Sequence, residues 1–307
     1  MNKGYSISVY RELEKQINNA SLYRPIRVER YEAGTELVYD VTGIPCTYKG
    51  SLRLVIDRFV GGGFAGQVYK VRILDMACEG EKIPGLEKGR DYAMKILIPP
   101  TSFSLIFRNA LYWLAFQGPF QLQVNPEAAR SGALWQKFIR RAARIRFGDE
   151  RAVVDIYATF VDRTLGSCGE LSEWIDGRTW RLEVDDHMDL LSQWKKGRLE
   201  DDERLGSPEY RAKHEFMYQF VKLLHDMGCH EFARQYEWYT CKSQPNCLKR
   251  KEMGDGPAAG LVAVDFRAGL ALLPFLPMSP GDFKLIGQGV LRGSLVQFDR
   301  GDIKGLE

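Results

Sequence analysis

Residues 59–71 read FVGGGFAGQVYKV, and this stretch decides how the rest of the 307-residue chain is interpreted. Its glycines and the valine that follows them have the spacing G-x-G-x-x-G-x-V, at Gly61, Gly63, Gly66 and Val68. The apolar residues 52–56 before the glycines and the alternating residues 67–74 after them predict two strands. The glycines therefore join two strands, whereas the glycine turn of a dinucleotide-binding fold opens a helix. Glycine suits such a turn because a Cβ would keep backbone N–H groups away from the oxygens of a bound phosphate.

A second stretch, DYAMKIL at residues 91–97, supplies a lysine on an expected strand. The ammonium group of Lys95 is a compact positive charge that can meet the same phosphates as the glycine turn. With these residues the sequence resembles the protein-kinase-like superfamily, because Ala93-Met94-Lys95 is similar to the Val-Ala-Ile-Lys of that family's third strand. The resemblance implies that ATP binds against the glycine turn, Val68 and Ala93, and that Lys95 holds its phosphates.

A helix is expected to follow the strand that carries Lys95. Asn125 can cap this helix, Pro126 suits its first turn, and the charge of Glu127 favours its positive end. The kinase-like family has its C-helix at this place in the order of elements, and a glutamate of that helix pairs with the strand-three lysine. The resemblance therefore implies that Glu127, the only acid between Lys95 and Asp149, positions Lys95. The alternative is a residue that only complements the helix dipole.

The strand expected over residues 152–161 precedes a stretch, residues 168–180, that resembles the fifth strand and hinge of a kinase. In kinases the backbone groups of the hinge hydrogen-bond the adenine ring. The resemblance implies that Glu173 belongs to the nucleotide site.

Three later stretches carry the second half of the resemblance. LHDMGCH at residues 224–230 is similar to the family's entry to the catalytic loop. KSQPNCL at residues 242–248 resembles a degenerate Lys-Pro-x-Asn-x-Leu, and LVAVDFR at residues 261–267 contains an Asp-Phe that resembles Asp-Phe-Gly. The resemblance implies that Asn246 and Asp265 hold the magnesium ion of a bound nucleotide, because amide and carboxylate oxygens suit this hard cation.

The catalytic acid is where the sequence departs from the family pattern. The family has an aspartate five residues before the asparagine, and that position is Cys241 here. Glu237 and Glu231 are the nearest upstream acids and the candidates for the base that would activate an acceptor hydroxyl; the alternative is that no base is positioned. Lys242 is the candidate for the charge role of the catalytic-loop lysine, and Arg267 stands where the family has the glycine of Asp-Phe-Gly.

A metal site of another kind is the rival interpretation of this region. Soft or borderline ligands lie within a short segment, at Cys229, His230, Cys241 and Cys247. Their spacing contains no Cys-x-x-Cys pair, so buried thiols are the alternative to a zinc site. No nucleophile elbow supports a hydrolase.

Composition argues against several broad classes of protein. The net charge of +3 is too small to indicate a nucleic-acid partner. No run of about 18 uncharged apolar residues exists, so we expect no membrane-spanning helix. The six cysteines are scattered, and residues 1–5 are not followed by the apolar region of a signal peptide, so we expect reduced thiols and a cytoplasmic protein.

The most apolar stretch, residues 103–116, is interrupted by Arg108 and Asn109. A buried core helix is our first interpretation of it. The alternatives are an amphipathic helix that docks on a protein partner and, less favoured, a helix that contacts a membrane. Two charge-rich segments, residues 77–90 and 181–206, are expected to form a solvated hairpin loop and an insert.

We therefore predict an α+β protein with a two-lobed protein-kinase-like fold. Residues 1–50 are expected to form an N-terminal extension packed on the N-lobe, residues 51–175 an antiparallel-sheet N-lobe with a helical insertion, and residues 176–307 a mainly helical, atypical C-lobe. No Ala-Pro-Glu follows Asp265, so the C-lobe is either atypical or part of a longer protein. The predicted function is transfer of the γ-phosphoryl group of ATP, with magnesium, to an unidentified acceptor. The alternative is a pseudokinase-type nucleotide-binding or scaffold module.

Overall fold

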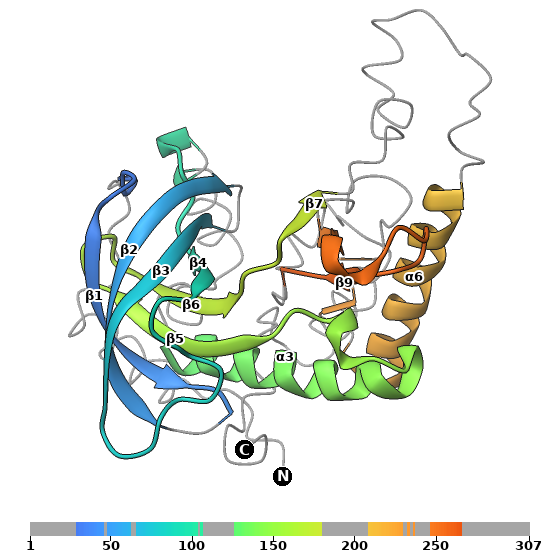
Figure 1. Ribbon diagram of the computed structural model, residues 1–307, viewed down its shortest axis with the longest axis horizontal. Coiled ribbons are helices and arrows are strands. Elements are labelled where there is room, and N and C mark those ends of the chain that lie inside the picture. Colours follow the sequence, from blue (N-terminus) through green and yellow to red (C-terminus); the bar gives the residue numbers. More distant parts are fainter. Residues whose placement is uncertain are drawn as a thin grey trace, which may run out of the picture. The chain divides into compact units, whose positions relative to one another are not determined.

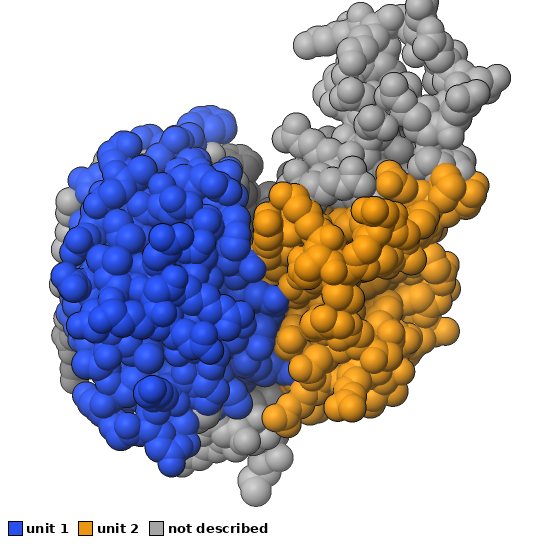
Figure 2. Space-filling view, in the orientation of Figure 1, with its two compact units in different colours: residues 1–137, 155–174, 293–307 blue, residues 138–154, 175–292 orange. Residues whose placement is uncertain are grey.

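The computed structural model has an α+β architecture of antiparallel sheets and helices (Figure 1). It describes residues 29–45, 48–62, 66–103, 105–106, 126–179, 208–229, 232–233, 236 and 246–265. The chain divides into two compact units, coloured in Figure 2. Unit 1 comprises residues 1–137, 155–174 and 293–307, and unit 2 comprises residues 138–154 and 175–292.

Unit 1 contains a closed six-stranded barrel in which all neighbouring strands are antiparallel. Its strands are β1 Glu36–Gly43, β2 Lys49–Gly62, β3 Gln67–Cys78, β4 Asp91–Ile96, β5 Ile156–Asp162 and β6 Ser167–Glu173. Their order around the barrel is β1-β2-β3-β4-β6-β5, and β1 closes it by pairing with β5. Residues 36–43, which we expected in an extension packed on the sheet, are thus one of its strands. Closure satisfies the backbone groups that an open sheet would leave at its edges.

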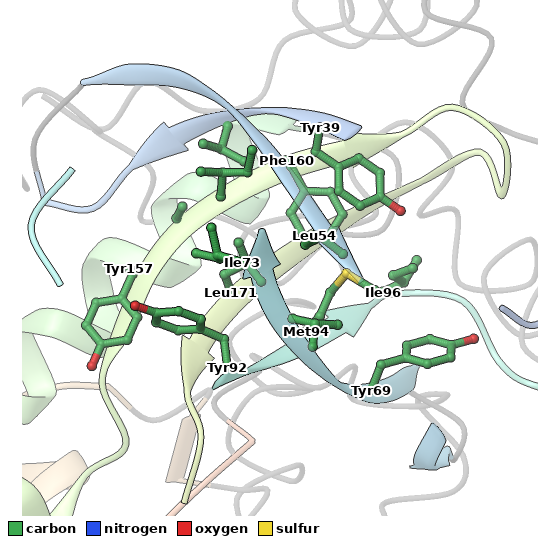
Figure 3. Packing of buried hydrophobic residues seen from close by; sticks show 14 of the residues in the cluster. Tyr39, Leu54, Tyr69, Ile73, Tyr92, Met94, Ile96, Tyr157, Phe160 and Leu171 are labelled. Carbon is green, nitrogen blue, oxygen red and sulfur yellow. The ribbon is translucent and has the colours of Figure 1, made fainter. Parts of the chain in front are cut away.

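The strands direct their apolar side chains into the barrel, where Figure 3 shows them packed against one another. On β4 the core residues are Tyr92, Met94 and Ile96. Because successive side chains of a strand point to opposite faces, Ala93 and Lys95 face outward from the barrel. The core therefore determines which face of β4 is available to a ligand.

The loop between β3 and β4 differs from the solvated hairpin loop that we expected. Its apolar residues Ile83 and Leu86 are buried in the barrel core. The hydroxyl of Tyr92 donates to the carbonyl of Gly85 at 2.8 Å and accepts from the N–H of Glu87 at 2.8 Å. The loop therefore covers part of the core with its apolar residues, while its charged residues stay exposed.

Helix α3, Pro126–Phe147, begins where the Asn-Pro-Glu signal predicts it. The half of α3 that belongs to unit 1 packs on the barrel through small and apolar residues. These contacts join Ala129 to Leu97 and Cys168, and Ala133 and Leu134 to Ile44 and Ile156. Arg130 adds a hydrogen bond of 2.9 Å to the carbonyl of Gly43 at the end of β1. Apolar packing and this hydrogen bond therefore both attach this half of the helix to the barrel.

Unit 2 contains helix α6, Pro208–Asp226, and a three-stranded antiparallel sheet of order β7-β8-β9. The strands are β7 Gly177–Thr179, β8 Cys247–Arg250 and β9 Leu261–Ala263, and the 3-10 helices are η2 Glu150–Ala152 and η4 Lys251–Met253. A series of aromatic rings packs within the unit. The centroids lie 5.0 Å apart for Phe147 and Phe216, 6.4 Å for Phe216 and Phe220, and 5.0 Å for Phe220 and Tyr236.

A glycine follows the end of helix α6, two residues after Asp226. Gly228 has φ 72°, in the left-handed region that glycine adopts without steric cost. Its N–H donates to the carbonyl of His225 at 2.9 Å, and the N–H of Cys229 donates to the carbonyl of Leu224 at 2.8 Å. These bonds satisfy carbonyl groups that the last turn would otherwise leave open.

The apolar stretch 103–116 is described only at its beginning. Leu105 is buried in the barrel core, whereas Phe103 and Ile106 are exposed. Residues 107–116 lie outside the described residues. In the part of the chain that the structure describes, no helix is long and apolar enough to cross a membrane.

Candidate functional site

One transverse row of residues crosses the outer face of the barrel and contains three of the predicted nucleotide-site residues. Gly61 of β2 pairs with Val68 of β3, and Val68 pairs with Lys95 of β4. Lys95 pairs in turn with Glu170 of β6, and Glu170 with Thr159 of β5. Directly opposite residues of antiparallel strands have Cβ atoms about 4.5–5.5 Å apart on the same face of a sheet. The glycine turn and Lys95 are therefore neighbours through strand pairing alone.

Lys95 is buried although it faces outward, with 8% of its surface exposed. Lysine is almost never buried to this extent unless a negative group accompanies it. A partly desolvated ammonium is also a strong site for an anion, because attraction between charges increases as water is excluded.

Glu170 is the acidic residue that the sequence interpretation missed. It is 7% exposed and faces Lys95 in the register of β4 and β6. The resemblance implies that Glu127, on the helix, is the acid that positions Lys95. A signal was nevertheless present, since the core residue Leu171 places its neighbour Glu170 on the outer face of the predicted strand.

The absence of a Cβ allows close backbone packing at Gly66, whereas at Gly61 it leaves open space. A Cβ added to Gly66 would lie 2.5 Å from the carbonyl oxygen of Ile96 and 3.3 Å from the Cα of Leu97. Close packing against the end of β4 therefore requires glycine at this position. A Cβ added to Gly61 would meet nothing within 4 Å, which leaves open space beside the strand. Gly63 lies outside the described residues.

Gln67 anchors the strand directly after the turn. Its side chain is fully buried, and its Nε2 donates to the carbonyls of Glu29 at 3.0 Å and Pro99 at 3.3 Å. The hydroxyl of Tyr69 donates to the Oε1 of Gln67 and accepts from the N–H of Tyr31 at 3.2 Å. The segment before β1 is thus tied to the residue that follows the glycine turn.

This hydrogen-bonded chain continues to a buried carboxylate, Asp162. Its Oδ2 accepts from the hydroxyls of Tyr31 at 2.7 Å and Tyr39 at 2.6 Å, and its Oδ1 accepts from the N–H of Leu165 at 2.6 Å. Burial, together with the nearby carboxylate, raises the pKa of both tyrosine hydroxyls, which therefore remain protonated donors. The cluster has a structural explanation, because these three donors to the carboxylate belong to the segment before β1, to β1 itself and to the turn between β5 and β6.

Ala93 lies on the same outer face as Lys95, two residues earlier on β4. It pairs with Lys70 of β3 and with Ser172 of β6. The ammonium of Lys70 lies 2.7 Å from a carboxylate oxygen of Asp91 and 5.4 Å from the ring centroid of Trp174. Cation–π attraction thus places the ring of Trp174 beside Lys70, the strand partner of Ala93.

Glu173 is engaged within unit 1. Its N–H donates to the carbonyl of Asp155 at 2.9 Å, and its Oε2 accepts from the N–H of Asp155 at 3.3 Å. The carboxylate of Asp155 lies 2.5 Å from the ammonium of Lys137 on α3. The N–H of Glu173 is therefore not available to adenine.

In unit 2 the two predicted magnesium ligands lie at the same end of the β8–β9 pair. Asn246 directly precedes β8, and its carbonyl accepts from the N–H of Val264 at 2.8 Å. Asp265 is the next residue along from Val264, and its φ of 64° is the one left-handed value among the described non-glycine residues. The hydroxyl of Tyr236 donates to the carbonyls of Val264 at 2.7 Å and Asp265 at 3.1 Å. A buried tyrosine thus holds a strained residue in place, which is a common property of functional sites.

The structure describes two of the four residues of the alternative zinc site. Cys229 and Cys247 are buried. Burial raises the pKa of the Cys247 thiol to about 11. Within the described ranges, no group of three or more His, Cys, Asp or Glu side chains could hold a metal ion.

Several predicted site residues cannot be placed in this geometry. Glu127 lies in α3, and nothing is described of its side chain. The other positions lie outside the described residues, namely Gly63, Glu231, Glu237, Cys241, Lys242 and Arg267, together with His230 of the alternative metal site. These assignments stay predictions.

No protein-family model and no curated protein matches the chain. Among solved structures, the crystal structure of the BubR1 kinase domain matches with a TM-score of 0.35 and 17% identity, over 85% of this chain and 60% of that one. A rhoptry kinase from Toxoplasma gondii matches with a TM-score of 0.33 and 12% identity, over 83% of this chain and 58% of that one. The chain thus spans about 60% of the length of these structures.

Proposed function

We propose that the chain has a two-lobed protein-kinase-like fold, binds ATP with magnesium, and transfers the γ-phosphoryl group to an acceptor. The observation that carries the proposal is the transverse row of unit 1, in which Gly61, Val68 and Lys95 are successive partners on neighbouring strands. In this proposal the glycine turn and Lys95 hold the phosphates, and Val68 and Ala93 contact the adenine ring.

The chemistry at Lys95 is electrostatic. Phosphoryl transfer depends mainly on alignment and on neutralising the charge of the transferred group. An ammonium held at a buried position of a strand loses little orientational freedom when it binds a phosphate. Lys95 is thereby suited to orient the phosphates that enter the site.

The chemistry of unit 2 is that of a hard cation. Asn246 and Asp265 lie on neighbouring strand ends and offer an amide and a carboxylate oxygen, the donor types that magnesium prefers. When bound there, magnesium would neutralise charge on the phosphates. Tyr236 supports this assignment, because it holds the backbone of Asp265 by a hydrogen bond.

The acceptor step is assigned to residues of the catalytic-loop region. Glu237, or Glu231 as the alternative, would accept the proton of an acceptor hydroxyl, and Lys242 would stabilise charge on the transferred group. Cys241 stands where the kinase-like family has an aspartate. This substitution favours a second candidate function, a nucleotide-binding or scaffold module with little or no transfer.

Location and partners are part of the proposal. None of the cysteines described, Cys78, Cys168, Cys229 and Cys247, is in a disulfide, which suits a reducing, cytoplasmic compartment. A nucleotide is the proposed ligand. The helix expected over residues 103–116 is the proposed contact for a protein partner, ahead of a membrane.

The first experiment measures the thermal unfolding midpoint with ATP, with and without magnesium. Wild-type protein should be stabilised, by about 2.7 kcal/mol at 100 times the dissociation constant. Lys95→Ala should lose the shift, whereas Lys88→Ala, at an exposed position of the β3–β4 loop, should retain it. Absence of an ATP-dependent shift in the wild type would count against both candidate functions.

The second experiment measures release and transfer of radiolabelled phosphate from ATP. An enzyme should turn over measurably and lose this turnover in Glu237→Gln, while keeping its ATP affinity. ATP binding without turnover above the Lys95→Ala background would select the scaffold module instead.

A further inference from the structure

We infer that Glu170 is the carboxylate that pairs with Lys95 and positions its ammonium, a role that the resemblance assigns to Glu127. The part that concerns phosphate rests on the proposed function. The pairing itself concerns only the folded protein and can be tested without nucleotide.

The register of the barrel brings the two side chains to the same face. Lys95 on β4 and Glu170 on β6 are direct partners in the antiparallel ladder. The core residues Met94 and Leu171 alternate with them and lie on the inner face. A lysine and a glutamate at directly opposite positions have side chains long enough to meet, given a Cβ separation of about 4.5–5.5 Å.

Burial gives the juxtaposition an energetic reason. Lys95 is 8% exposed and Glu170 is 7% exposed, so both residues have lost most of their contact with water. Removing a lone charge from water is costly, and buried charges are accordingly paired. Two buried charges of opposite sign at paired positions attract each other, and this attraction offsets the cost of removing each charge from water.

The backbone of Glu170 is fixed by strand pairing on both of its sides. It lies in the middle of β6, which pairs with β4 on one side and with β5 on the other. Its position follows from two strand ladders and is independent of how helix α3 packs on the barrel. The inference therefore predicts that Lys95 stays oriented when the contacts of α3 are weakened.

The test is a double-mutant cycle of unfolding without nucleotide, using Lys95→Met, Glu170→Gln and the double variant. Each single variant leaves one buried charge without its partner and should lower the unfolding midpoint by about 6–12 °C. The double variant should be more stable than additivity predicts, by at least about tenfold in the unfolding equilibrium constant. The matched control combines Glu170→Gln with Lys70→Met, whose ammonium pairs with Asp57 and Asp91, and should be additive.

The double-mutant cycle tests the pairing of Lys95 with Glu170, and ATP titration tests the proposed function separately. Additivity of Lys95→Met and Glu170→Gln, or coupling of Lys95→Met to Glu127→Gln instead, would overturn the pairing. If the pairing holds and ATP binds, Glu170→Gln should weaken ATP binding in calorimetry by about tenfold, and Glu170→Asp should weaken it less. Coupling in the cycle with no ATP binding by the wild type would establish the pairing and reject the nucleotide function. Coupling with ATP binding unchanged in Glu170→Gln would reject the positioning role.

Discussion

The hydroxyl of Tyr236 lies 3.1 Å from the carbonyl oxygen of Asp265 and also donates to the carbonyl of Val264, so one buried side chain holds the peptide groups on both sides of Asp265. Asp265 has a left-handed backbone at φ 64°. For a residue with a side chain this conformation persists only when surrounding contacts determine it. The hydrogen bonds of Tyr236 supply such contacts within unit 2.

Tyr236→Phe tests this relationship. The change removes the hydroxyl and leaves two partly buried carbonyls without that donor, which should destabilise unit 2 by about 1 kcal/mol. Urea unfolding would measure the loss. Tyr48→Phe is the control, since its hydroxyl bonds to Glu81 at an exposed site and should contribute less. Equal, small effects of both changes would contradict the role given to Tyr236.

Asp265→Asn separates the charge of Asp265 from its backbone conformation. Asparagine also tolerates the left-handed region, so stability should change by less than about 1 kcal/mol. The magnesium-dependent part of ATP binding should be lost, because the carboxylate ligand is gone. Calorimetric titration of ATP with and without magnesium would measure it. An unchanged magnesium dependence would reject Asp265 as a metal ligand.

Gly66→Ala and Gly61→Ala should affect different properties. The new Cβ at Gly66 would lie 2.5 Å from the carbonyl oxygen of Ile96, so overpacking should cost about 1–3 kcal/mol in unfolding free energy. The Cβ at Gly61 meets open space, so stability should be nearly unchanged. If phosphates approach this backbone, Gly61→Ala should instead weaken ATP binding. Wild-type affinity in Gly61→Ala would argue against close approach at this glycine.

Asp91→Asn should change how the stability of unit 1 depends on pH. The hydrogen bond from Arg72, assisted by Lys70, holds the pKa of Asp91 below its ordinary value. Because the folded pKa is lowered, this stabilisation is present above the unfolded pKa of about 3.9 and is lost as pH falls through the folded value. The partners are partly exposed, so the contribution should be at most about 1 kcal/mol.

Thermal unfolding of Asp91→Asn between pH 7 and pH 3 would measure that contribution. The difference from the wild type should be largest at pH 7 and should shrink toward pH 3. Glu36→Gln is a control, since it removes an exposed carboxylate 3.5 Å from Arg53. A difference that grows on acidification would contradict the sign of the shift.

Local signals in the sequence predicted much of the secondary structure. The strands on both sides of the glycine turn and the start of α3 at Pro126 depend on residues close in sequence, as does the left-handed Gly228 that follows α6. Alternation, capping and glycine's access to a left-handed φ act over a few residues, so they can be recognised without a fold. The burial of Ile83 and Leu86 in the barrel core was not predicted, because the residues that they contact lie on other strands.

The sequence by itself determined which residues offer phosphate and metal chemistry: a glycine turn between strands, a lysine on the next strand, and an asparagine and an aspartate near two later strands. Only the tertiary structure decided that β1 closes a barrel, that Glu170 faces Lys95, and that Tyr236 holds the backbone of Asp265. The physical reason is sequence separation. Residue type and local spacing are properties of a short segment, whereas these three relationships join residues from distant segments, such as Tyr236 and Asp265, which lie 29 positions apart.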